Sequence, residues 1–181
     1  MQTSSNLLHQ LIALARRDAP NETCGIIGGK DQRALKIYPL KNTHATPRVN
    51  FYAAPLELLA AFRDIEANDW EHLAIYHSHC ATEAYPSETD IARAYYPDAM
   101  HLIVSFAHPE QIVVRGFRII EGKIIEITVE VNDDETSRTH QRRVARRTGG
   151  SRAGRAVAAF SRRRHARGQT RRARRRVPEK I

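Results

Sequence analysis

Hydrophobic positions recur every three or four residues in several stretches of the chain, and this spacing predicts helices that face a core. The first predicted helix begins at Ser4 or Ser5. The second begins at Pro55, a residue that fits a first helical turn, and runs to about Asn68. A third, short helix is predicted over residues 88–96. The apolar positions of the first helix are Leu7, Leu8, Leu11, Ile12, Leu14 and Ala15.

Short apolar or alternating runs between these helices predict strands. The runs cover residues 24–29, 34–40, 73–79, 100–106, 111–120 and 124–131. The first two are expected to pair as a hairpin, and Glu121-Gly122-Lys123 predicts a tight turn between the last two. Helices interspersed with strands predict an α/β domain, which we expect to end near Asn132.

Residues 133–181 differ in composition from this predicted domain at residues 1–132. Residues 1–135 hold 12 Lys or Arg and 19 Asp or Glu, a net charge of −7, whereas residues 136–181 hold 17 Lys or Arg and one Glu, a net charge of +16. Such a basic tail cannot bury enough apolar surface to offset its ordering entropy, so we predict that it is disordered. Three accounts of it stay open: non-specific binding of a nucleic acid or another polyanion, folding back on the acidic domain, or no function.

The composition favours a cytoplasmic protein without a membrane span. Two cysteines, Cys24 and Cys80, provide no disulfide framework. No stretch reaches the roughly 18 apolar residues of a membrane helix, and the N-terminus lacks the basic start and long apolar run of a signal peptide. We therefore expect a reducing cytoplasm.

The candidate chemistry is concentrated in one stretch, YHSHCATEAYPSETD. His77 and His79 lie two apart at the end of a predicted strand, so both imidazoles point to the same side. Ser87 is predicted to cap the third helix, which places Asp90 in its first turn, facing back toward the strand. Two imidazoles and a carboxylate are a ligand set of catalytic zinc. Taken singly, these residues have simpler interpretations, namely structural histidines and a helix cap.

The same residues resemble the motif of the JAMM (MPN+) metalloprotease family. The pattern is His-Ser-His, seven residues, Ser, two residues and Asp. The family motif also has a glutamate upstream, near the first strand, and Glu22 in PNETCG takes that place. The resemblance covers about residues 5–132. It implies a JAMM/MPN-like fold, a mixed and mostly antiparallel sheet flanked by helices.

The resemblance also implies a zinc metallopeptidase. Zn²⁺ would be held by His77, His79 and Asp90. Glu22 would act as general base and then general acid, and Ser87 would hydrogen-bond the oxyanion. The intervening residues ATEAYPS resemble a bacterial branch of the family. That branch releases cysteine from the C-terminus of a ubiquitin-like sulfur-carrier protein, which would be the partner of this chain.

Three residues outside the motif positions carry further expectations. Ser78 points to the opposite face of its strand and is expected to brace the nearby loop. Cys80 stands where many family members have Pro and this branch often has Thr, and its thiol is either a packed side chain or a redox-sensitive competitor for zinc. Asn42 resembles a family position beside the substrate channel.

Two other functions stay open. One is a JAMM isopeptidase that acts on other ubiquitin-like conjugates, although the chain has no insertion long enough to grip ubiquitin. The other is a nucleic-acid-associated protein in which the basic tail carries the main function. The sequence lacks the HExxH, zinc-deaminase and GxSxG motifs, which excludes three common classes of hydrolytic site.

Overall fold

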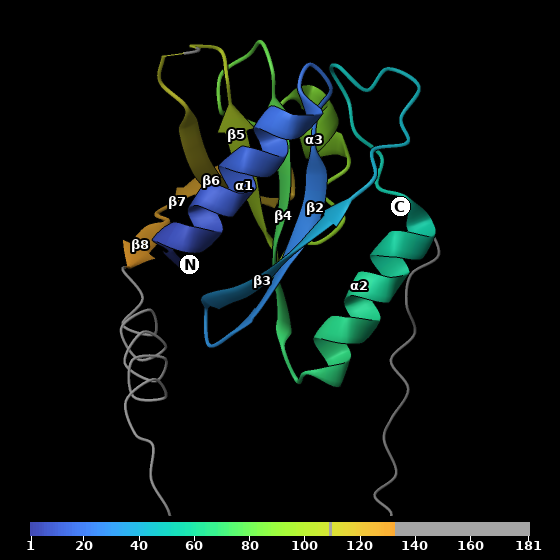
Figure 1. Cartoon of the computed structure of the whole chain (residues 1–181), viewed down its shortest axis with the longest axis vertical. Helices are drawn as coiled ribbons and strands as arrows, with labels where there is room; N and C mark the ends of the chain where they lie inside the picture. Colours follow the sequence, from blue (N-terminus) through green and yellow to red (C-terminus); the bar gives the residue numbers. More distant parts are fainter. Residues whose placement is uncertain (109, 133–181) are drawn as a thin grey trace, which may run out of the picture. The chain divides into compact units, whose positions relative to one another are not determined.

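The computed structural model describes residues 1–108 and 110–132, which form an α/β fold of three helices and an eight-stranded sheet (Figure 1). The elements in chain order are β1 (Gln2–Ser4), α1 (Ser5–Asp18), β2 (Cys24–Lys30), β3 (Arg33–Leu40), α2 (Pro55–Ala67), β4 (Glu71–His79), α3 (Glu88–Ala92), β5 (Met100–Ser105), β6 (Val113–Ile120), β7 (Lys123–Ile127) and β8 (Glu130–Asn132).

The sheet is mixed, with the strand order β7-β6-β5-β4-β2-β3-β1-β8. Among the described residues, four strand pairs are antiparallel and three are parallel, the latter being β4–β5, β1–β3 and β1–β8. The prediction of a mixed, mostly antiparallel sheet flanked by helices is confirmed. A parallel pair needs a crossover connection. Because α3 lies in the crossover from β4 to β5, this topology brings α3 back to the sheet next to these strands.

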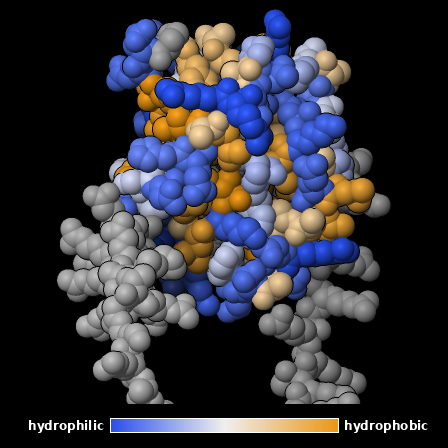
Figure 2. Space-filling view, in the orientation of Figure 1, coloured by the Kyte–Doolittle hydropathy of each residue, from blue (hydrophilic) through white to orange (hydrophobic). Residues whose placement is uncertain are grey.

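Different helices cover the two faces of the sheet. Successive residues of a strand point to opposite faces, so neighbouring residues pack against different helices. On β2, Ile27 belongs to a core cluster with Leu11 of α1, whereas the preceding residue Ile26 clusters with Ile65 of α2. Figure 1 shows α1 running across the strands and α2 lying apart from it. Figure 2 shows polar side chains outermost on the side of the molecule that α1 presents, with apolar side chains visible between them.

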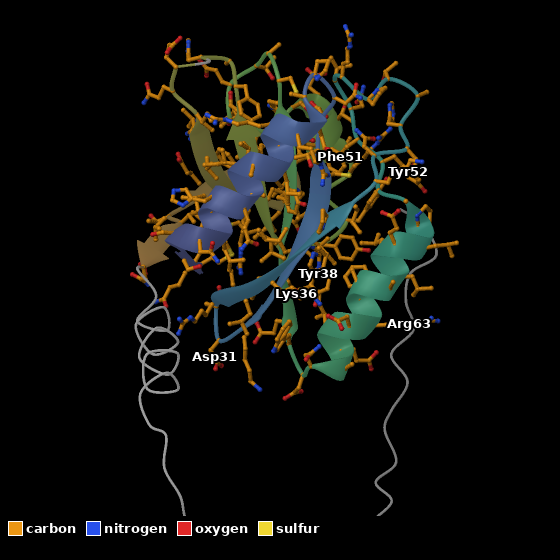
Figure 3. All side chains as sticks on the ribbon, viewed as in Figure 1. Asp31, Lys36, Tyr38, Phe51, Tyr52 and Arg63 are labelled. Atoms are coloured by element: carbon orange, nitrogen blue, oxygen red, sulfur yellow. The ribbon has the colours of Figure 1, made fainter. Side chains whose placement is uncertain are left out.

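The helices begin where local signals predict. Ser4 caps α1 with its side-chain oxygen, and Pro55 occupies the first turn of α2. Helix α2 is joined to β3 by Asp64, whose carboxylate accepts hydrogen bonds from Lys36 Nζ at 2.7 Å and Tyr38 Oη at 2.6 Å. Figure 3 shows Lys36 and Tyr38 on the β3 side that faces α2.

One predicted helix boundary is wrong. Helix α3 ends at Ala92 instead of continuing to Tyr96. The backbone tightens at this point, since the N–H of Ala94 bonds to the carbonyl of Ile91, three residues earlier, at 3.3 Å. The residues that follow α3 therefore form a connection to β5, and some of them line the pocket described below.

The predicted last strand is in fact two strands. β7 ends at Ile127 and pairs with β6, whereas β8 begins at Glu130 and pairs with β1, a strand that the sequence analysis did not predict. The amino group of Met1 donates a hydrogen bond to the carbonyl of Thr128, between the two strands, and the N–H of Glu130, at the start of β8, donates to the carbonyl of Met1. The chain crosses from one end of the strand order to the other within two residues, so the sheet is curled. β6 also begins two residues later than predicted.

Within the described part of the chain, no helix is long and apolar enough to cross a membrane. The predicted disorder of the basic tail at residues 133–181 lies outside the described residues.

Candidate metal centre

His77 and His79 reach the same face of the sheet from the end of β4. This strand lies inside the sheet between β2 and β5, and His77 is in register with Cys24 on one side and Ile103 on the other. The exposed fraction is 1% for His77 and 5% for His79. The predicted alternation therefore places two imidazoles together and away from solvent.

Asp90 approaches these imidazoles from α3 through a capping box with Ser87. The Ser87 hydroxyl accepts a hydrogen bond from the Asp90 N–H at 3.2 Å and donates one to Asp90 Oδ2 at 2.7 Å, and the Ser87 N–H donates to the same oxygen at 2.7 Å. Asp90 Oδ1 lies 3.3 Å from His77 Nε2, and Oδ2 lies 3.5 Å from His79 Nε2. A short local motif thus aims the carboxylate at both histidines.

The separations among these three side chains fit a tetrahedral metal ion. The Nε2 atoms of His77 and His79 are 3.0 Å apart. Ligands at 2.0–2.1 Å from a tetrahedral zinc ion are about 3.3 Å from one another. The ligand atoms of His77, His79 and Asp90 all lie within 4.8 Å of one another. Two nitrogen lone pairs at such a distance repel unless a proton or a cation lies between them, so the donor set suits zinc.

Contacts with neighbouring residues orient the imidazole rings of His77 and His79. His79 Nδ1 lies 2.8 Å from the Glu83 carbonyl oxygen. A carbonyl only accepts hydrogen bonds, so Nδ1 carries the proton and Nε2 of the neutral ring is left as a ligand. Phe51 stacks on His77 with ring centroids 4.7 Å apart. His77 Nδ1 is buried and has no hydrogen-bond partner among the described residues.

The electrostatics of His77, His79 and Asp90 favour the binding of a cation among them. Burial by itself would raise the pKa of Asp90, but hydrogen bonds from His77, His79 and Ser87 outweigh it and hold this pKa far below its ordinary range. Burial would lower the pKa of His79, but the Asp90 carboxylate and the Glu83 carbonyl outweigh it and raise this pKa. A metal ion and protons therefore compete for the same nitrogens.

Glu22 lies in the loop before β2, at the wall of the same pocket as His79 and Asp90. Its side chain is 6% exposed. The pKa of its carboxyl is raised from 4.5 to about 7, mainly by burial; His79 opposes this shift and Asp90 adds to it. A carboxylate with a pKa near neutrality can both accept and return a proton.

The loop that carries Glu22 is braced from two sides. The N–H of Thr23 donates to Ser78 Oγ at 2.9 Å, which confirms the prediction that Ser78 braces this loop. The carbonyl of Glu22 accepts a hydrogen bond from Asn42 Nδ2 at 2.9 Å, and its N–H donates to the Pro47 carbonyl at 2.7 Å. Asn42 therefore positions the glutamate through its backbone, whereas the sequence suggested only a place beside the substrate channel.

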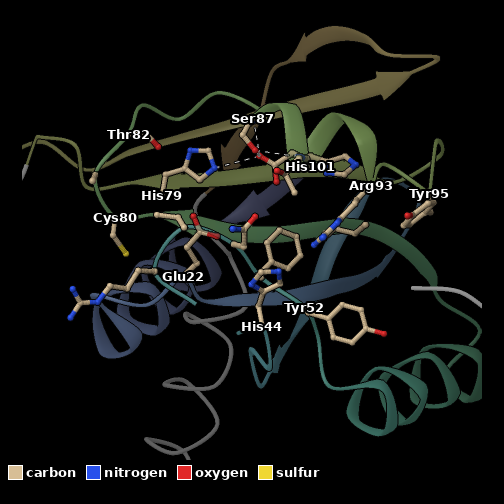
Figure 4. Close-up of a pocket in the computed structure, with 18 of the residues that line it drawn as sticks. Glu22, His44, Tyr52, His79, Cys80, Thr82, Ser87, Arg93, Tyr95 and His101 are labelled. Atoms are coloured by element: carbon tan, nitrogen blue, oxygen red, sulfur yellow. Dashed lines mark hydrogen bonds and ion pairs between the residues drawn. The ribbon is translucent and has the colours of Figure 1, made fainter. Parts of the chain in front are cut away.

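A pocket of about 470 Å³ opens beside the donors (Figure 4). Its lining includes the predicted site residues Glu22, His79, Ser87 and Asp90. The other residues are His44, Arg48, Val49, Asn50, Phe51, Tyr52, Ile75, Cys80, Ala81, Thr82, Thr89, Arg93, Tyr95, Tyr96 and His101. The places of Phe51, Arg93, His101 and the Glu83 carbonyl at the site are not predictable from sequence motifs. Phe51 and His101 meet the site only through tertiary packing. Glu83 and Arg93 lie within four residues of His79 and Asp90 along the chain, but neither belongs to a recognisable motif.

Cys80 lies at the edge of this pocket rather than among the grouped donors. Its Sγ lies 3.5 Å from the Asn21 carbonyl oxygen, and the group with metal-ligand spacing does not include it. Burial raises the pKa of its thiol, with Ser78 opposing and Glu22 adding to the effect. This environment favours the thiol over the thiolate that zinc binds, which supports the packed interpretation.

Comparison with known proteins gives this fold and site a family. Residues 4–120 match the family of prokaryotic homologs of the JAB domain. The CysO-cysteine peptidase of Mycobacterium tuberculosis is 38% identical over 130 residues, which are 70% of this chain and 88% of that protein. The desampylase of Haloferax volcanii is 36% identical over 93 residues, 50% of this chain and 67% of that protein.

A solved structure is also similar. The solution structure of a protein from Desulfitobacterium hafniense has a TM-score of 0.67 and 32% sequence identity, and the match covers 74% of this chain and 93% of that one. Together with the family match over more than half of the sequence, these similarities show that the chain belongs to the prokaryotic JAB-domain branch of the JAMM/MPN family and is a hydrolase.

Proposed function

We propose that this protein is a zinc-dependent metallopeptidase that removes a C-terminal cysteine from a ubiquitin-like sulfur-carrier protein. The observation that carries this proposal is the triangle of His77, His79 and Asp90 donors, 3.0–3.5 Å apart, with the buried Glu22 carboxylate in the wall of the adjoining pocket. The substrate class is supported by the similarity to the mycobacterial peptidase over 88% of its length.

His77, His79 and Asp90 would hold the metal, and zinc bound there would supply Lewis acidity toward water and the scissile carbonyl. Glu22 would accept a proton from the attacking water and return it to the leaving amine. Burial raises the pKa of this carboxyl in the metal-free protein, so the protonated form is accessible to it there. Phe51, stacked on His77, would help to exclude bulk water.

Ser87 would stabilise the developing oxyanion, but its single hydroxyl proton is engaged with Asp90 Oδ2. The hydroxyl would have to rotate toward the substrate for this step. Asp90 would keep the hydrogen bond from the Ser87 backbone N–H, so its orientation would survive the rotation. Ser87 thus has a holding role in the resting site and an electrostatic role during reaction.

A second candidate is an isopeptidase that acts on other ubiquitin-like conjugates. The similarity to the archaeal desampylase favours it, although the match covers only half of this chain. The two candidates share the metal and Glu22. They differ in the leaving group, which is a single amino acid in the first case and a modified protein in the second.

The proposal is tested with zinc-loaded protein and a sulfur-carrier protein that ends in Gly-Gly-Cys, with intact mass as the readout. We expect the loss of one cysteine residue, and a chelator should abolish it. Glu22→Gln should lower the rate by about 10²- to 10⁴-fold with one zinc retained. Glu66→Gln, on the exposed surface of α2, is the matched control and should react as the wild type does.

Full activity in zinc-loaded Glu22→Gln would contradict the mechanism. No release of cysteine despite bound zinc would favour the isopeptidase, which is then tested with isopeptide-linked carrier conjugates.

We assign the activity to a reducing cytoplasm, where the free thiols of Cys24 and Cys80 would persist.

A further inference from the structure

The pocket beyond the metal donors has a one-sided charge. Among the residues that the structure describes, the acidic ones in its lining are Glu22 and Asp90, and both belong to the candidate metal centre. The remaining charged lining residues are Arg48 and Arg93, accompanied by histidines and aromatic side chains. A ligand that extends from the metal into this pocket therefore meets positive charge and hydrogen-bond donors, which favours a negatively charged group.

His101 is a buried polar side chain in this lining without a partner. It lies on β5 in register with Ile75, two residues before the position that pairs with His77, so it shares their face of the sheet. It is 4% exposed, and neither of its ring nitrogens has a hydrogen-bond partner among the described residues. A neutral imidazole always carries one N–H donor. Because buried polar atoms are normally paired, this donor points to a ligand that completes the site.

Arg93 supplies a second side-chain hydrogen-bond donor that has no partner. It is the C-terminal cap of α3, three residues after Asp90, and lines the same pocket. Figure 4 shows its side chain extending into the pocket that His101 also lines. Arg17 and Arg115 each form an ion pair with a neighbouring carboxylate. The backbone of Arg93 is hydrogen-bonded within α3 and to Tyr95, but its exposed guanidinium forms no ion pair or hydrogen bond with any residue of 1–108 or 110–132.

We propose that Arg93 and His101 bind the free α-carboxylate of the amino acid that is released, so that the pocket selects a C-terminal residue. This inference rests on the proposed function and deepens it. The α-carboxylate lies two bonds from the scissile nitrogen, close to the metal, and guanidinium binds carboxylate with two parallel hydrogen bonds. The lysine side chain released from an isopeptide carries no carboxylate at that distance, so it would leave both donors unpaired.

The test compares two carrier substrates, one ending in Gly-Gly-Cys with a free carboxylate and one ending in the same cysteine as its amide. We expect wild-type kcat/KM to be roughly 10- to 150-fold higher for the free acid, the range of a charge-assisted hydrogen-bond pair. Arg93→Gln should lower kcat/KM on the acid to near the level of the amide, with a much smaller loss on the amide, whose neutral carbonyl accepts a weaker hydrogen bond. Arg93→Lys should restore part of the preference.

Two controls fix the assignment. Arg63→Gln removes an exposed arginine that projects from α2 in Figure 3 and should keep the full preference for the acid. Arg48→Gln tests the other arginine of the pocket, and loss of the preference in this variant rather than in Arg93→Gln would overturn the assignment. His101→Gln should weaken the preference with zinc content unchanged. Zinc content and urea unfolding are measured for every variant, so that a misfolded protein is not counted.

The outcomes distinguish carboxylate recognition from cysteine release, the proposed function on which it rests. Equal cleavage of acid and amide by the wild type would overturn carboxylate recognition and leave cysteine release standing. Cleavage of neither substrate by zinc-loaded wild type would overturn the proposed function itself. A preference for the acid that disappears in Arg93→Gln, and only partly in Arg93→Lys, would establish the pocket as the site of the leaving residue.

Discussion

At the scale of single residues, Ser87 both caps α3 and orients the carboxylate of Asp90, the proposed metal ligand. Its hydroxyl accepts the Asp90 N–H as a helix cap and donates to the Asp90 carboxylate, which faces both histidines. Ser4 performs only the first of these roles, at the start of α1, where it accepts the Leu7 N–H at 3.2 Å. Variants of the two serines can therefore distinguish the loss of a helix cap from the loss of a hydrogen bond to the proposed metal ligand Asp90.

We predict that Ser87→Ala lowers zinc affinity about 10- to 100-fold, the usual effect of losing a partner of a metal ligand. It should also lower the free energy of unfolding by about 1 kcal/mol through loss of the cap. Ser4→Ala should show a similar loss of stability with unchanged zinc affinity. Competition with a chromophoric chelator measures the first quantity, and urea unfolding measures the second. Equal zinc affinities in the two variants would contradict a role of Ser87 at the metal.

Glu22 leads to a prediction about pH in the metal-free protein. Burial raises its pKa from 4.5 to about 7, so the folded state holds a proton between these values that the unfolded chain has released. This contribution to stability is complete below pH 4.5 and is lost as the pH rises through 7. We expect the free energy of unfolding to fall by on the order of 2 kcal/mol across this window.

The measurement is urea unfolding of chelator-treated wild type and Glu22→Gln at pH 5 and pH 8. The variant lacks the titrating group, so its stability relative to the wild type should increase between the two pH values. A difference between the proteins that stays constant with pH would show that Glu22 is not held in a desolvating environment.

At the scale of elements, one side chain organises the connection at residues 41–54 between β3 and α2. Asn42 Nδ2 donates to the carbonyl oxygens of Glu22 at 2.9 Å and Asn50 at 3.0 Å, and Asn42 Oδ1 accepts from the N–H groups of His44 and Tyr52 at 3.0 and 3.1 Å. This connection supplies the pocket wall from His44 through Tyr52. The connection contains an isolated β-bridge between Asn42 and Ala53 but no helix or strand, so side-chain hydrogen bonds such as these contribute much to its shape.

We predict that Asn42→Ala lowers the free energy of unfolding by about 2–3 kcal/mol, since it leaves several backbone groups unpaired. It should reduce kcat by at least tenfold, because the Glu22 backbone loses its anchor, while zinc affinity stays the same. Asn68→Ala is the matched control: its amide bonds the Asp64 carbonyl at 2.7 Å at the end of α2, away from the site. It should cost about 1 kcal/mol or less and leave kcat unchanged. An unchanged kcat in Asn42→Ala would show that the connection does not position Glu22.

At the scale of the whole molecule, charge divides the chain into two parts with different expected roles. Residues 1–135 carry a net charge of −7 and contain the site, whereas residues 136–181 carry +16. We propose that residues 1–132 form an independent catalytic domain. Catalysis and any binding of polyanions should then reside in separate segments of the chain.

We predict that a chain truncated after residue 132 folds, binds one zinc ion and cleaves the carrier with unchanged kcat/KM. Full-length protein should bind double-stranded DNA non-specifically, with an affinity that falls steeply with salt, and the truncated chain should not bind it. Fluorescence anisotropy at several salt concentrations is the measurement. Absence of DNA binding by the full-length protein would leave the tail without this role, and loss of cleavage on truncation would contradict an independent domain.

Features that depend on local geometry can be predicted from the amino-acid sequence. Alternation along β4 put His77 and His79 on one side, and the cap at Ser87 directed Asp90 back toward them, because both relations act over a few residues. The same is true of the helix starts at Ser4 and Pro55. The upstream glutamate came from the resemblance, since no local signal distinguishes Glu22 from a solvated loop acid.

Features that depend on distant segments arise only when the chain has folded. The curl of the sheet follows from the pairing of β8 with β1, two short strands whose sequences have weak local signals. The raised pKa of Glu22 follows from burial beneath the connection that Asn42 holds. The pocket that brings Arg93 beside the sheet face of His101 exists because α3 lies in the crossover between β4 and β5. Desolvation and side-chain pairing are properties of the packed chain, so a linear sequence does not display them.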